Sequence, residues 1–515
     1  MSDATAARGY VTDIGYTAGF YPETAPAHLA FALWSAGRDP GPPPARVLEL
    51  GFGQGFGLCL LAAASPDTAF EGHDFNARHV AGARVLATCA GLANLTLAQS
   101  DFSGLAALDG ARDSDVILAH GVMSWVAPPV RQAVMEIARQ RLRDGGSMLA
   151  SYNSLPGWAR LLPLLQLAAA VREAAPGGSA QAIAQTLALL AALQESGAEM
   201  FMDNRVLATQ VSGMRQRDPA YLAHEYLSEG AAPLAFAQMA ELAAGAGLAY
   251  SASATTIENF DACCIAPALL ALLDATENGA LRETLRDMML DKQFRRDIFA
   301  RPSPQRAAPA VPGFVLAVPP HQLDLDIATP RPSAAAPLLA PMLEAIAGGM
   351  ADFDALASLP ACRDAPPAVL REGLALLVRS GQVLPLMRPP AQDRRPAHRF
   401  NRFVADFART GRLHTHLASP VARTGIPVGE FGLLALAALS DGEAGDAERA
   451  GRHGLETVKR LGARPAENGV PIEDDAAAAG FLARHLSNVI ADWFPVWHRL
   501  GVIRGNGCNC GNYRL

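Results

Sequence analysis

The sequence is poor in charged and aromatic residues and contains few cysteines. Of its 515 residues, 18% are charged and 6% are aromatic, while 50% are hydrophobic. The seven scattered cysteines do not make a disulfide scaffold, which favours a reducing cytoplasm. The balance of 43 basic against 50 acidic residues lacks the basic excess of a general nucleic-acid binder. Neither a signal peptide nor an apolar run of membrane-spanning length is seen, so we expect a soluble cytoplasmic protein.

What the sequence does contain is enough apolar material for several domains. Up to residue 153, strand patterns alternate with helical ones, which is typical of a parallel, doubly wound sheet. Residues 159–228 are rich in Ala, Leu and Gln and are expected to be nearly all helical. A late strand is expected over 248–255. The five earlier strands are expected at 45–50, 68–75, 95–102, 114–123 and 147–153.

The strongest motif follows the first expected strand and reads ELGFGQGFG over residues 49–57. Glycines at this place let the backbone approach a ligand at the amino terminus of the next helix. The dinucleotide fingerprint G-x-G-x-x-G would need glycine at position 56, which is Phe56. The acidic-x-G-x-G-x-G spacing instead matches class I S-adenosylmethionine-dependent methyltransferases. Glu49 would offer a carboxylate to the cationic methionyl end of that cofactor.

Further polar and aromatic residues end the next three expected strands. Asp74 is suited to accept hydrogen bonds from ribose hydroxyls, although alone it would be more typical of a helix cap. Asp101 can accept a hydrogen bond from the adenine amino group, and Phe102 can cover the adenine ring. His120 lies at the crevice outside the strand ends. Four such features at consecutive strand ends predict an S-adenosylmethionine site. It comprises Glu49, Gly51, Gly53, Gln54, Gly55, Asp74, Phe75, Asp101, Phe102, His120 and Gly121.

The fifth expected strand ends in SYNSLPGW, residues 151–158, which brings candidate acceptor-binding groups to the same edge. Tyr152 and Asn153 could orient an amine by hydrogen bonds, and Trp158 or Trp125 could form an aromatic wall that favours a cation. The alternative is that this segment is only a turn and that Trp158 is an anchor in the core.

A second candidate cluster, HEYL, follows the helical stretch at residues 224–227. Glu225 could balance the charge of a substrate and His224 could relay a proton. A structural cap or a salt-bridged helix end is an equally good interpretation of the same residues.

Seven segments occur in an order that resembles a known family. They are GYTAGFYPETAPAHLA, LELGFGQGFG, GHDFNARHV, HGVMSWV, SYNSLPGW, HEYL and DKQFRRDIFAR. Over roughly residues 10–302 the chain resembles bacterial methyltransferases with a methyltransferase regulatory domain, among them rickettsial protein lysine methyltransferases that act on an outer membrane protein. The resemblance implies a helical dimerisation segment, a middle domain and a C-terminal domain. It also implies that Tyr16 closes over the cofactor, with Tyr152, Asn153 and Trp158 near the acceptor.

We therefore predict an α/β protein with a Rossmann-like class I methyltransferase sheet, a helical insertion and mostly α-helical, partly winged-helix-like C-terminal domains. Its expected function is methyl transfer from S-adenosylmethionine to protein lysine side chains by a homodimer. The alternatives are N- or O-methylation of a small molecule and a scaffold that senses the cofactor without turnover. The expected units are 1–158 with 229–260 (cofactor domain), 159–228 (insertion, dimerisation), 261–302 (middle segment), 303–390 (winged-helix-like) and 391–515 (helical).

Two other features carry less weight. The pair Cys508-Asn-Cys510 has no second pair or histidines to complete a metal site, so no metal is expected. The cluster Arg295, Arg296 and Arg301 either binds acidic protein segments or, more commonly for arginines, ties domains together through salt bridges.

Overall fold

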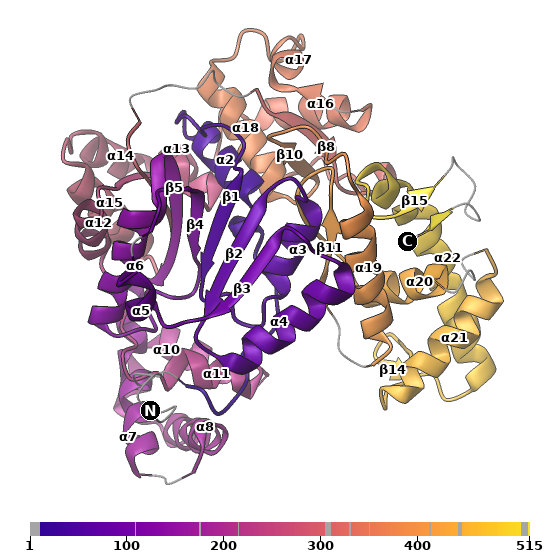
Figure 1. Ribbon diagram of the computed structural model, residues 1–515, viewed down its shortest axis with the longest axis horizontal. Coiled ribbons are helices and arrows are strands. Elements are labelled where there is room, and N and C mark those ends of the chain that lie inside the picture. Colours follow the sequence, from indigo (N-terminus) through magenta and orange to yellow (C-terminus); the bar gives the residue numbers. More distant parts are fainter. Residues whose placement is uncertain are drawn as a thin grey trace.

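The computed structural model arranges the other units around a central sheet (Figure 1). In this view the helical insertion lies below the sheet, residues 313–386 lie above it, and the C-terminal helices lie to its right. The structure describes residues 11–108, 110–174, 177–214, 216–303, 311–328, 331–349, 351–410, 414–440, 445–505 and 513–514.

The central sheet has seven strands in the order β3-β2-β1-β4-β5-β7-β6. The first five are parallel to one another, and β7 runs antiparallel to both β5 and β6. Every residue of β4 is buried, as expected for a central strand covered on both faces. The predicted fold class is therefore confirmed. The strands are β1 (Arg46–Leu50), β2 (Ala69–Asp74), β3 (Leu95–Gln99), β4 (Ser114–Ala119), β5 (Leu142–Asn153), β6 (Ala249–Ser253) and β7 (Phe294–Ala300).

Helices cover both faces of this sheet. One face packs against α2 (Pro26–Ser35), α3 (Phe56–Ala64) and α4 (Ala77–Ala90) through a core that includes Leu29, Leu58 and Val80. The other face packs against α5, α6 and α12. Their bounds are Phe102–Ala106, Pro128–Arg141 and Phe236–Gly245.

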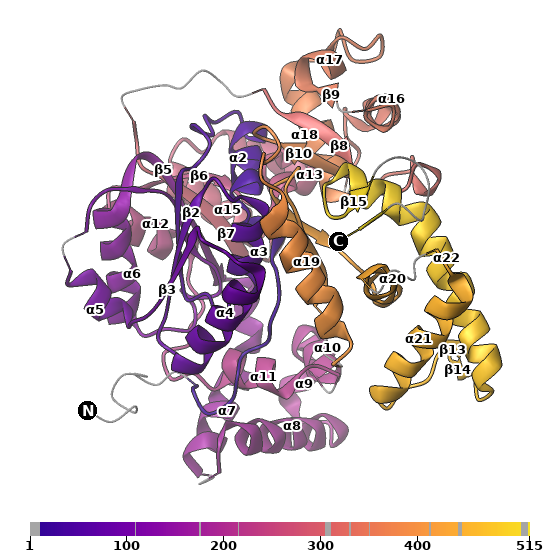
Figure 2. The same ribbon diagram turned by 45° about the vertical axis from the view of Figure 1, so that its right-hand side comes forward.

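The range 159–228 forms a helical unit with its own apolar core. Leu164, Leu190 and Leu207 belong to this core, and so do Val11 and Trp158, which tie it to the cofactor domain. The insertion thus lies against the ends of the sheet strands rather than apart from them (Figure 2). Its helices are α7 (Leu162–Ala174), α8 (Ser179–Glu195), α9 (Glu199–Met202), α10 (Arg205–Met214) and α11 (Pro219–Tyr226).

Residues 261–302 do not form a middle segment apart from the sheet. The helices α13 (Asp261–Cys264), α14 (Pro267–Asp274) and α15 (Gly279–Leu290) lead directly into β7. The predicted boundary at residue 260 therefore falls between β6 and β7, although these two strands pair in one sheet. The charged residues of β7 interrupt the apolar pattern of a strand, so the sequence predicts a basic cluster there and not a strand.

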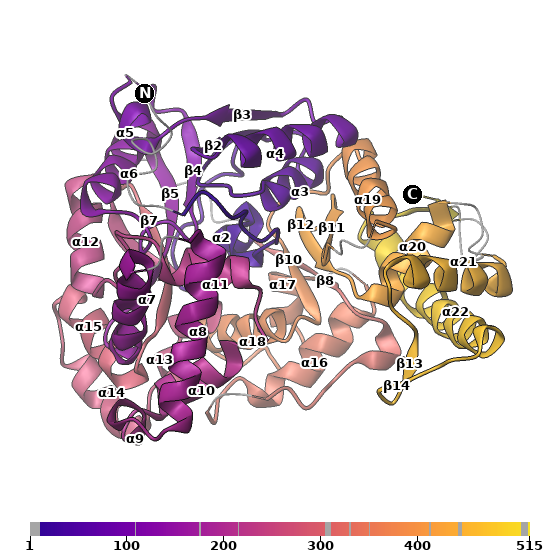
Figure 3. The same ribbon diagram turned by 90° about the horizontal axis from the view of Figure 1, so that it is seen from below.

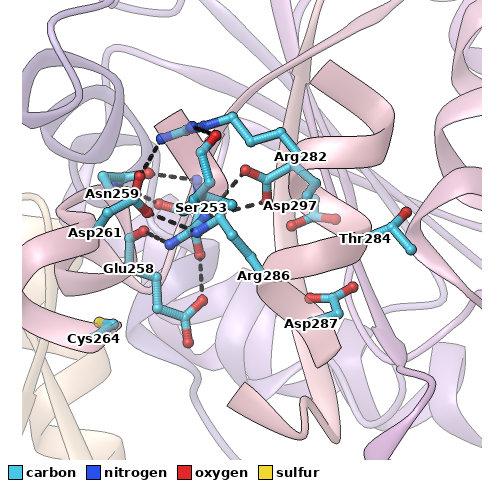
Figure 4. A network of polar contacts seen from close by, with 12 residues as sticks. Ser253, Glu258, Asn259, Asp261, Cys264, Arg282, Thr284, Arg286, Asp287 and Asp297 are labelled. Carbon is cyan, nitrogen blue, oxygen red and sulfur yellow. Dashed lines mark hydrogen bonds and ion pairs between the residues drawn. The ribbon is translucent and has the colours of Figure 1, made fainter. Parts of the chain in front are cut away.

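Buried charges hold α15 against β7 and against the segment that follows β6. Arg295 is 4% exposed and forms ion pairs with Asp287 at 2.6 Å and Glu283 at 2.8 Å. Arg286 pairs with Asp261 at 2.8 Å (Figure 4) and with Glu283 at 3.2 Å. Removing one partner of such a pair leaves a buried charge uncompensated, which destabilises the fold strongly. The network therefore fixes the position of β7.

Beyond β7 the chain forms two further units. The first is an antiparallel sheet in the order β10-β8-β9 with three helices. The second packs α19 on α3 and α4 (Figure 3). There the ring centroid of Phe56 lies 5.5 Å from that of Phe400 and 4.1 Å from that of His414. Their main elements are β8 (Gly313–Leu316), α16 (Ala336–Ala347), β9 (Ala351–Asp352), α17 (Phe353–Ala357), α18 (Pro367–Arg379), β10 (Val383–Leu386), α19 (Arg395–Ala408), β11 (His416–Ser419), β12 (Thr424–Pro427), α20 (Glu430–Ser440), α21 (Ala447–Arg460) and α22 (Asp475–Arg499).

Candidate active site

A cavity of about 470 Å³ lies at the carboxyl ends of β1, β2, β4 and β5, where an open α/β sheet binds its ligands. All the predicted cofactor-binding residues line it, and so do all the predicted acceptor-side residues except His224. These lining residues are Tyr16, Glu49, Gly51, Gly53, Gln54, Gly55, Asp74, Phe75, Asp101, Phe102, His120, Gly121, Trp125, Tyr152, Asn153, Trp158 and Glu225.

The glycine loop between β1 and α3 forms one end of the cavity. Gly53 and Gly55 have φ angles of 58° and 74°, in the left-handed region that glycine adopts without strain. A Cβ on Gly55 would lie 2.5 Å from the Cβ of Ala83, so close packing on α4 also requires glycine there. The loop therefore presents bare backbone to the cavity just before α3 begins at Phe56.

Asp74, at the end of β2, is 4% exposed and organises this loop. Its Oδ2 accepts a hydrogen bond from the Gly53 N–H at 2.8 Å, and its Oδ1 accepts one from the Asn76 N–H at 2.8 Å. Asn76, not Asp74, caps α4. A carboxylate has about four acceptor positions, so Asp74 retains capacity for ribose hydroxyls. Its predicted ribose role stays a prediction, to which the structure adds the fixing of the loop.

The predicted adenine-binding pair lies after β3. Asp101 is the N-cap of α5, and its Oδ1 accepts a hydrogen bond from the Gly104 N–H at 2.8 Å. Phe102 begins α5, and its ring tip lies 3.7 Å from the place where a Cβ on Gly51 would be. Both residues face the cavity, so the predicted contacts with adenine stay a prediction that this geometry permits.

Glu49 lies in the cavity wall, and one oxygen of its carboxyl group lacks a partner in the part of the chain that the structure describes. Its Oε2 is buried and has no hydrogen-bond partner among the residues that the structure describes. Burial, reinforced by the nearby Asp74 carboxylate, raises the pKa of Glu49 to about 7. A buried carboxylate without a partner is costly until a cation or a donor meets it. The site therefore fits a cofactor that carries positive charge at this end.

Tyr152 and Asn153 are neighbours in β5 and so point to opposite faces of the sheet. The Tyr152 side chain is fully buried, and its hydroxyl donates a hydrogen bond to Asp297 Oδ2 at 2.6 Å, next to Arg295. The phenol therefore belongs to the charge network of Arg295 and Asp297, and its predicted role in orienting an acceptor amine stays a prediction that this hydrogen bond does not favour.

Asn153 points to the other face of the sheet and lines the cavity. Its backbone N–H donates to the Ser124 hydroxyl at 2.6 Å, which fixes the strand end. Its side-chain amide donates to Glu225 Oε1 at 3.2 Å. Burial raises the pKa of Glu225 to about 7, although the hydrogen bond from Asn153 acts in the opposite direction. The structure thus brings together two residues that lie far apart in the sequence and were proposed separately.

Aromatic rings line the same cavity as this pair. The ring centroid of Trp158 lies 6.3 Å from that of Tyr226, and the centroid of Tyr16 lies 5.8 Å from that of Trp125. Trp158 is 5% exposed and belongs to the core of the insertion, so it is both an anchor and a wall of the cavity. These rings offer π faces to a cationic acceptor.

His224 is the one predicted site residue that does not line the cavity. Its Nε2 lies 3.0 Å from the carbonyl oxygen of Ile14, and its ring packs edge-on against Tyr16 with centroids 5.1 Å apart. Burial lowers its pKa. Because His224 and Glu225 are adjacent on a helix, their side chains diverge. His224 contacts the N-terminal segment, and its predicted role as a proton relay stays a prediction that these contacts do not favour.

The sequence reasoning missed several residues of the cavity wall, among them Tyr21, Tyr221 and Arg296. Tyr221 lies one helical turn before Glu225, so the i, i+4 spacing could have placed both on one face. Burial raises the pKa of Tyr221 to about 12. Arg296 belongs to the cluster expected either to bind acidic protein segments or to tie domains together through salt bridges. Arg301 of this cluster donates to the carbonyl oxygen of Leu142 at 3.0 Å, a contact within the sheet domain.

Within the described ranges, no group of three or more His, Cys, Asp or Glu residues could hold a metal ion. Cys508 and Cys510 lie outside the described residues. Among the helices that the structure describes, none is both long and apolar enough to cross a membrane.

The fold is that of Rossmann-like class I methyltransferases, and the cavity lies where this fold binds its ligands. Residues 47–146 match the family model of a methyltransferase domain, and residues 218–301 match that of a predicted methyltransferase regulatory domain. The chain is an S-adenosylmethionine-dependent methyltransferase that joins these two domains, as the motifs predicted.

Related proteins extend the likeness beyond these two domains. An uncharacterized protein of Synechocystis sp. is 28% identical over 506 residues, which cover 96% of this chain and 99% of the relative. An uncharacterized protein of Rickettsia prowazekii is 25% identical over 285 residues, 55% of this chain and 51% of the relative. The structure of PKMT2 from Rickettsia typhi has a TM-score of 0.66 at 18% identity and covers 95% of this chain and 99% of PKMT2. PKMT2 in complex with AdoHcy gives a TM-score of 0.65 at 18% identity, over 92% and 98% of the two chains.

Proposed function

We propose that this methyltransferase acts on the ε-amine of protein lysine side chains. The observation that carries the proposal is the buried Asn153–Glu225 pair, set among aromatic rings at the acceptor end of the cavity. A carboxylate and π faces suit a cationic acceptor that must become a neutral nucleophile.

The cofactor end of the cavity would be held by residues of the strand ends. Glycines 51, 53 and 55 give the backbone room for close approach, Asp74 offers acceptors to ribose hydroxyls, and Glu49 offers its unpartnered Oε2 to positive charge. When bound, S-adenosylmethionine supplies an electrophilic methyl group on a cationic sulfur.

At the acceptor end, a lysine arrives as an ammonium, because its ordinary pKa is about 10.4. Glu225 is 7% exposed, and burial raises its pKa to about 7. Its carboxylate can therefore pair with the ammonium and accept its proton, directly or through water. Asn153 fixes the Glu225 carboxyl group by its 3.2 Å hydrogen bond. Trp158 and Tyr226 limit the access of water and offer π faces to the cation.

The comparisons support a protein acceptor. The chain resembles rickettsial protein lysine methyltransferases in its motifs, and it shares the fold of PKMT2 over nearly its whole length. The half of the chain beyond the sheet is not needed for the chemistry, so it is available for the recognition of a protein.

We also propose that the helical insertion joins two copies of the chain. Its helix α8 exposes Leu189 and Leu193 at 40% and 37%, respectively. Light scattering should give a dimer mass for the intact protein and a monomer mass for the doubly substituted Leu189→Lys, Leu193→Lys protein. A monomeric intact protein would contradict this part of the proposal.

Incubation of the protein with methyl-labelled S-adenosylmethionine and cell lysate tests the acceptor class. We expect label in protein bands, and its loss with Asn153→Ala at unchanged cofactor affinity. Label confined to the small-molecule fraction would favour a metabolite methyltransferase instead. Cofactor binding without any transfer would favour a cofactor-sensing scaffold.

A further inference from the structure

A row of polar side chains runs along one face of the sheet at its carboxyl edge. Glu49 in β1 pairs with Leu118, two residues before His120. Continuing the β4–β5 register by one residue places His120 beside Ser151, and Ser151 pairs with Arg296 in β7. Since residues two apart in a strand share a face, Glu49, His120, Ser151 and Arg296 lie on the same face.

The two ends of this row carry opposite charges and face one cavity. Glu49 and Arg296 both line it, although their strands are separated by β4 and β5. Three strand spacings correspond to about 14 Å between the backbones. This separation between a glutamate and an arginine that line one cavity leaves room between them for a small zwitterionic group.

Arg296 has donors to spare for a ligand. Its side chain is 34% exposed, and its guanidinium lies 4.8 Å from the Phe294 ring centroid. It forms an ion pair with Glu23, which is 13% exposed and does not line the cavity. Because a guanidinium has five N–H donors, the pair with Glu23 fixes Arg296 without using all of them.

Two other members of this row, Glu49 and His120, each have a buried polar atom without a partner in the described ranges. The buried Oε2 of Glu49 and Nδ1 of His120 have no hydrogen-bond partner among the described residues. Burial lowers the pKa of His120 to about 4, so the ring is neutral at physiological pH and adds no charge to compete with Arg296. Tyr21 covers the His120 ring, with centroids 4.4 Å apart. This end of the cavity is therefore polar and enclosed, and it contains buried atoms that lack hydrogen-bond partners within the described structure.

We propose that Arg296 binds the carboxylate of the amino-acid end of the cofactor, while Glu49 faces its ammonium group and Glu23 orients Arg296. The proposal rests on the proposed function and names a contact that the glycine motif does not. Arg296 lies within residues 218–301, the part that matches the regulatory-domain model. The regulatory domain would then be part of the cofactor site, joined to it through β7 and the buried network of Arg295.

The test compares two ligands by isothermal titration calorimetry. S-adenosylhomocysteine has the amino-acid end, whereas 5′-methylthioadenosine keeps the adenosine and the sulfur but lacks that end. We expect Arg296→Met to weaken the binding of S-adenosylhomocysteine by about tenfold or more and to leave that of 5′-methylthioadenosine within about twofold. Arg296→Lys keeps the charge but not the fork of donors and should give an intermediate loss. Arg395→Met, at an arginine whose side chain is 73% exposed, is the matched control and should change neither affinity.

Equal losses for both ligands, or no loss for S-adenosylhomocysteine, would overturn the assignment of Arg296. If the unchanged protein binds neither ligand, the proposed function itself fails, and the inference fails with it. Glu23→Gln separates orientation from contact: it should weaken only S-adenosylhomocysteine, and by less than Arg296→Met does. Circular dichroism of each variant establishes that it is folded.

Discussion

Glu225 offers the sharpest test of the acceptor site, because its carboxylate should speed methyl transfer and, being buried, should destabilise the folded protein. Glu225→Gln keeps the size of the side chain and an oxygen that can accept the hydrogen bond from Asn153. It removes the group that can take up a proton. Without that group, methyl transfer should slow by about 10²–10⁴-fold, the usual contribution of a positioned acid or base. In the unchanged enzyme the rate should rise with pH through about 7, as Glu225 ionises. This rise should be absent in the variant.

The same substitution should make the protein more stable at alkaline pH. Burial raises the pKa of Glu225 from 4.5 to about 7, so the folded protein holds this proton over a range in which the unfolded chain has lost it. Stability therefore falls as pH rises from about 4.5 to about 7, by on the order of 3 kcal/mol at most. Glu225→Gln should raise the thermal unfolding midpoint at pH 8 and change it little at pH 5.

The two readouts together separate catalysis from folding. Initial rates of methyl transfer from pH 5.5 to 9, with thermal unfolding at both extremes, provide the data. A variant within about twofold of the normal rate, with the same rise near pH 7, would refute the role of Glu225. A variant that is less stable at pH 8 would show that the carboxylate is needed by the fold.

Three further substitutions test the rest of the site. Asn153→Ala should abolish most transfer and leave cofactor affinity unchanged by calorimetry; full activity would remove Asn153 from the acceptor site. Asp74→Ala should weaken S-adenosylhomocysteine binding by about tenfold or more, since it removes both a ribose acceptor and the anchor of Gly53, and unchanged affinity would contradict this role. Tyr152→Phe should lower the free energy of unfolding by about 1–2 kcal/mol, because Asp297 loses a donor, yet leave transfer by the folded enzyme intact. A specific loss of transfer would restore Tyr152 to the acceptor site.

The cofactor half of the site could be predicted from the sequence because its geometry is local. The glycine loop, Asp74, Asp101 and His120 each follow a strand, and parallel strands end at one edge of a sheet. That rule alone brings these residues to one cavity. The alternation of side chains in β5 was available too and, had it been applied, would have placed only one of Tyr152 and Asn153 at the acceptor.

The acceptor half depends on contacts between distant segments. Glu225 reaches Asn153 only because the insertion folds back over the strand ends, and no local pattern encodes that path. Arg296 enters the cavity only because β7 inserts antiparallel between β5 and β6. Its strand was hard to recognise because Arg295 and Asp297 are buried charges that interrupt the apolar pattern, and their compensation by Glu283 and Asp287 comes from tertiary packing.

The most direct test of the central claim is mass spectrometry of proteins after incubation of the enzyme and cell lysate with S-adenosylmethionine that carries a deuterated methyl group. The account predicts deuterated methyl groups on lysine ε-amines of one or a few proteins, present with the intact enzyme and absent with Asn153→Ala. Deuterated methyl groups found only on small molecules, or only on protein residues other than lysine, would contradict it.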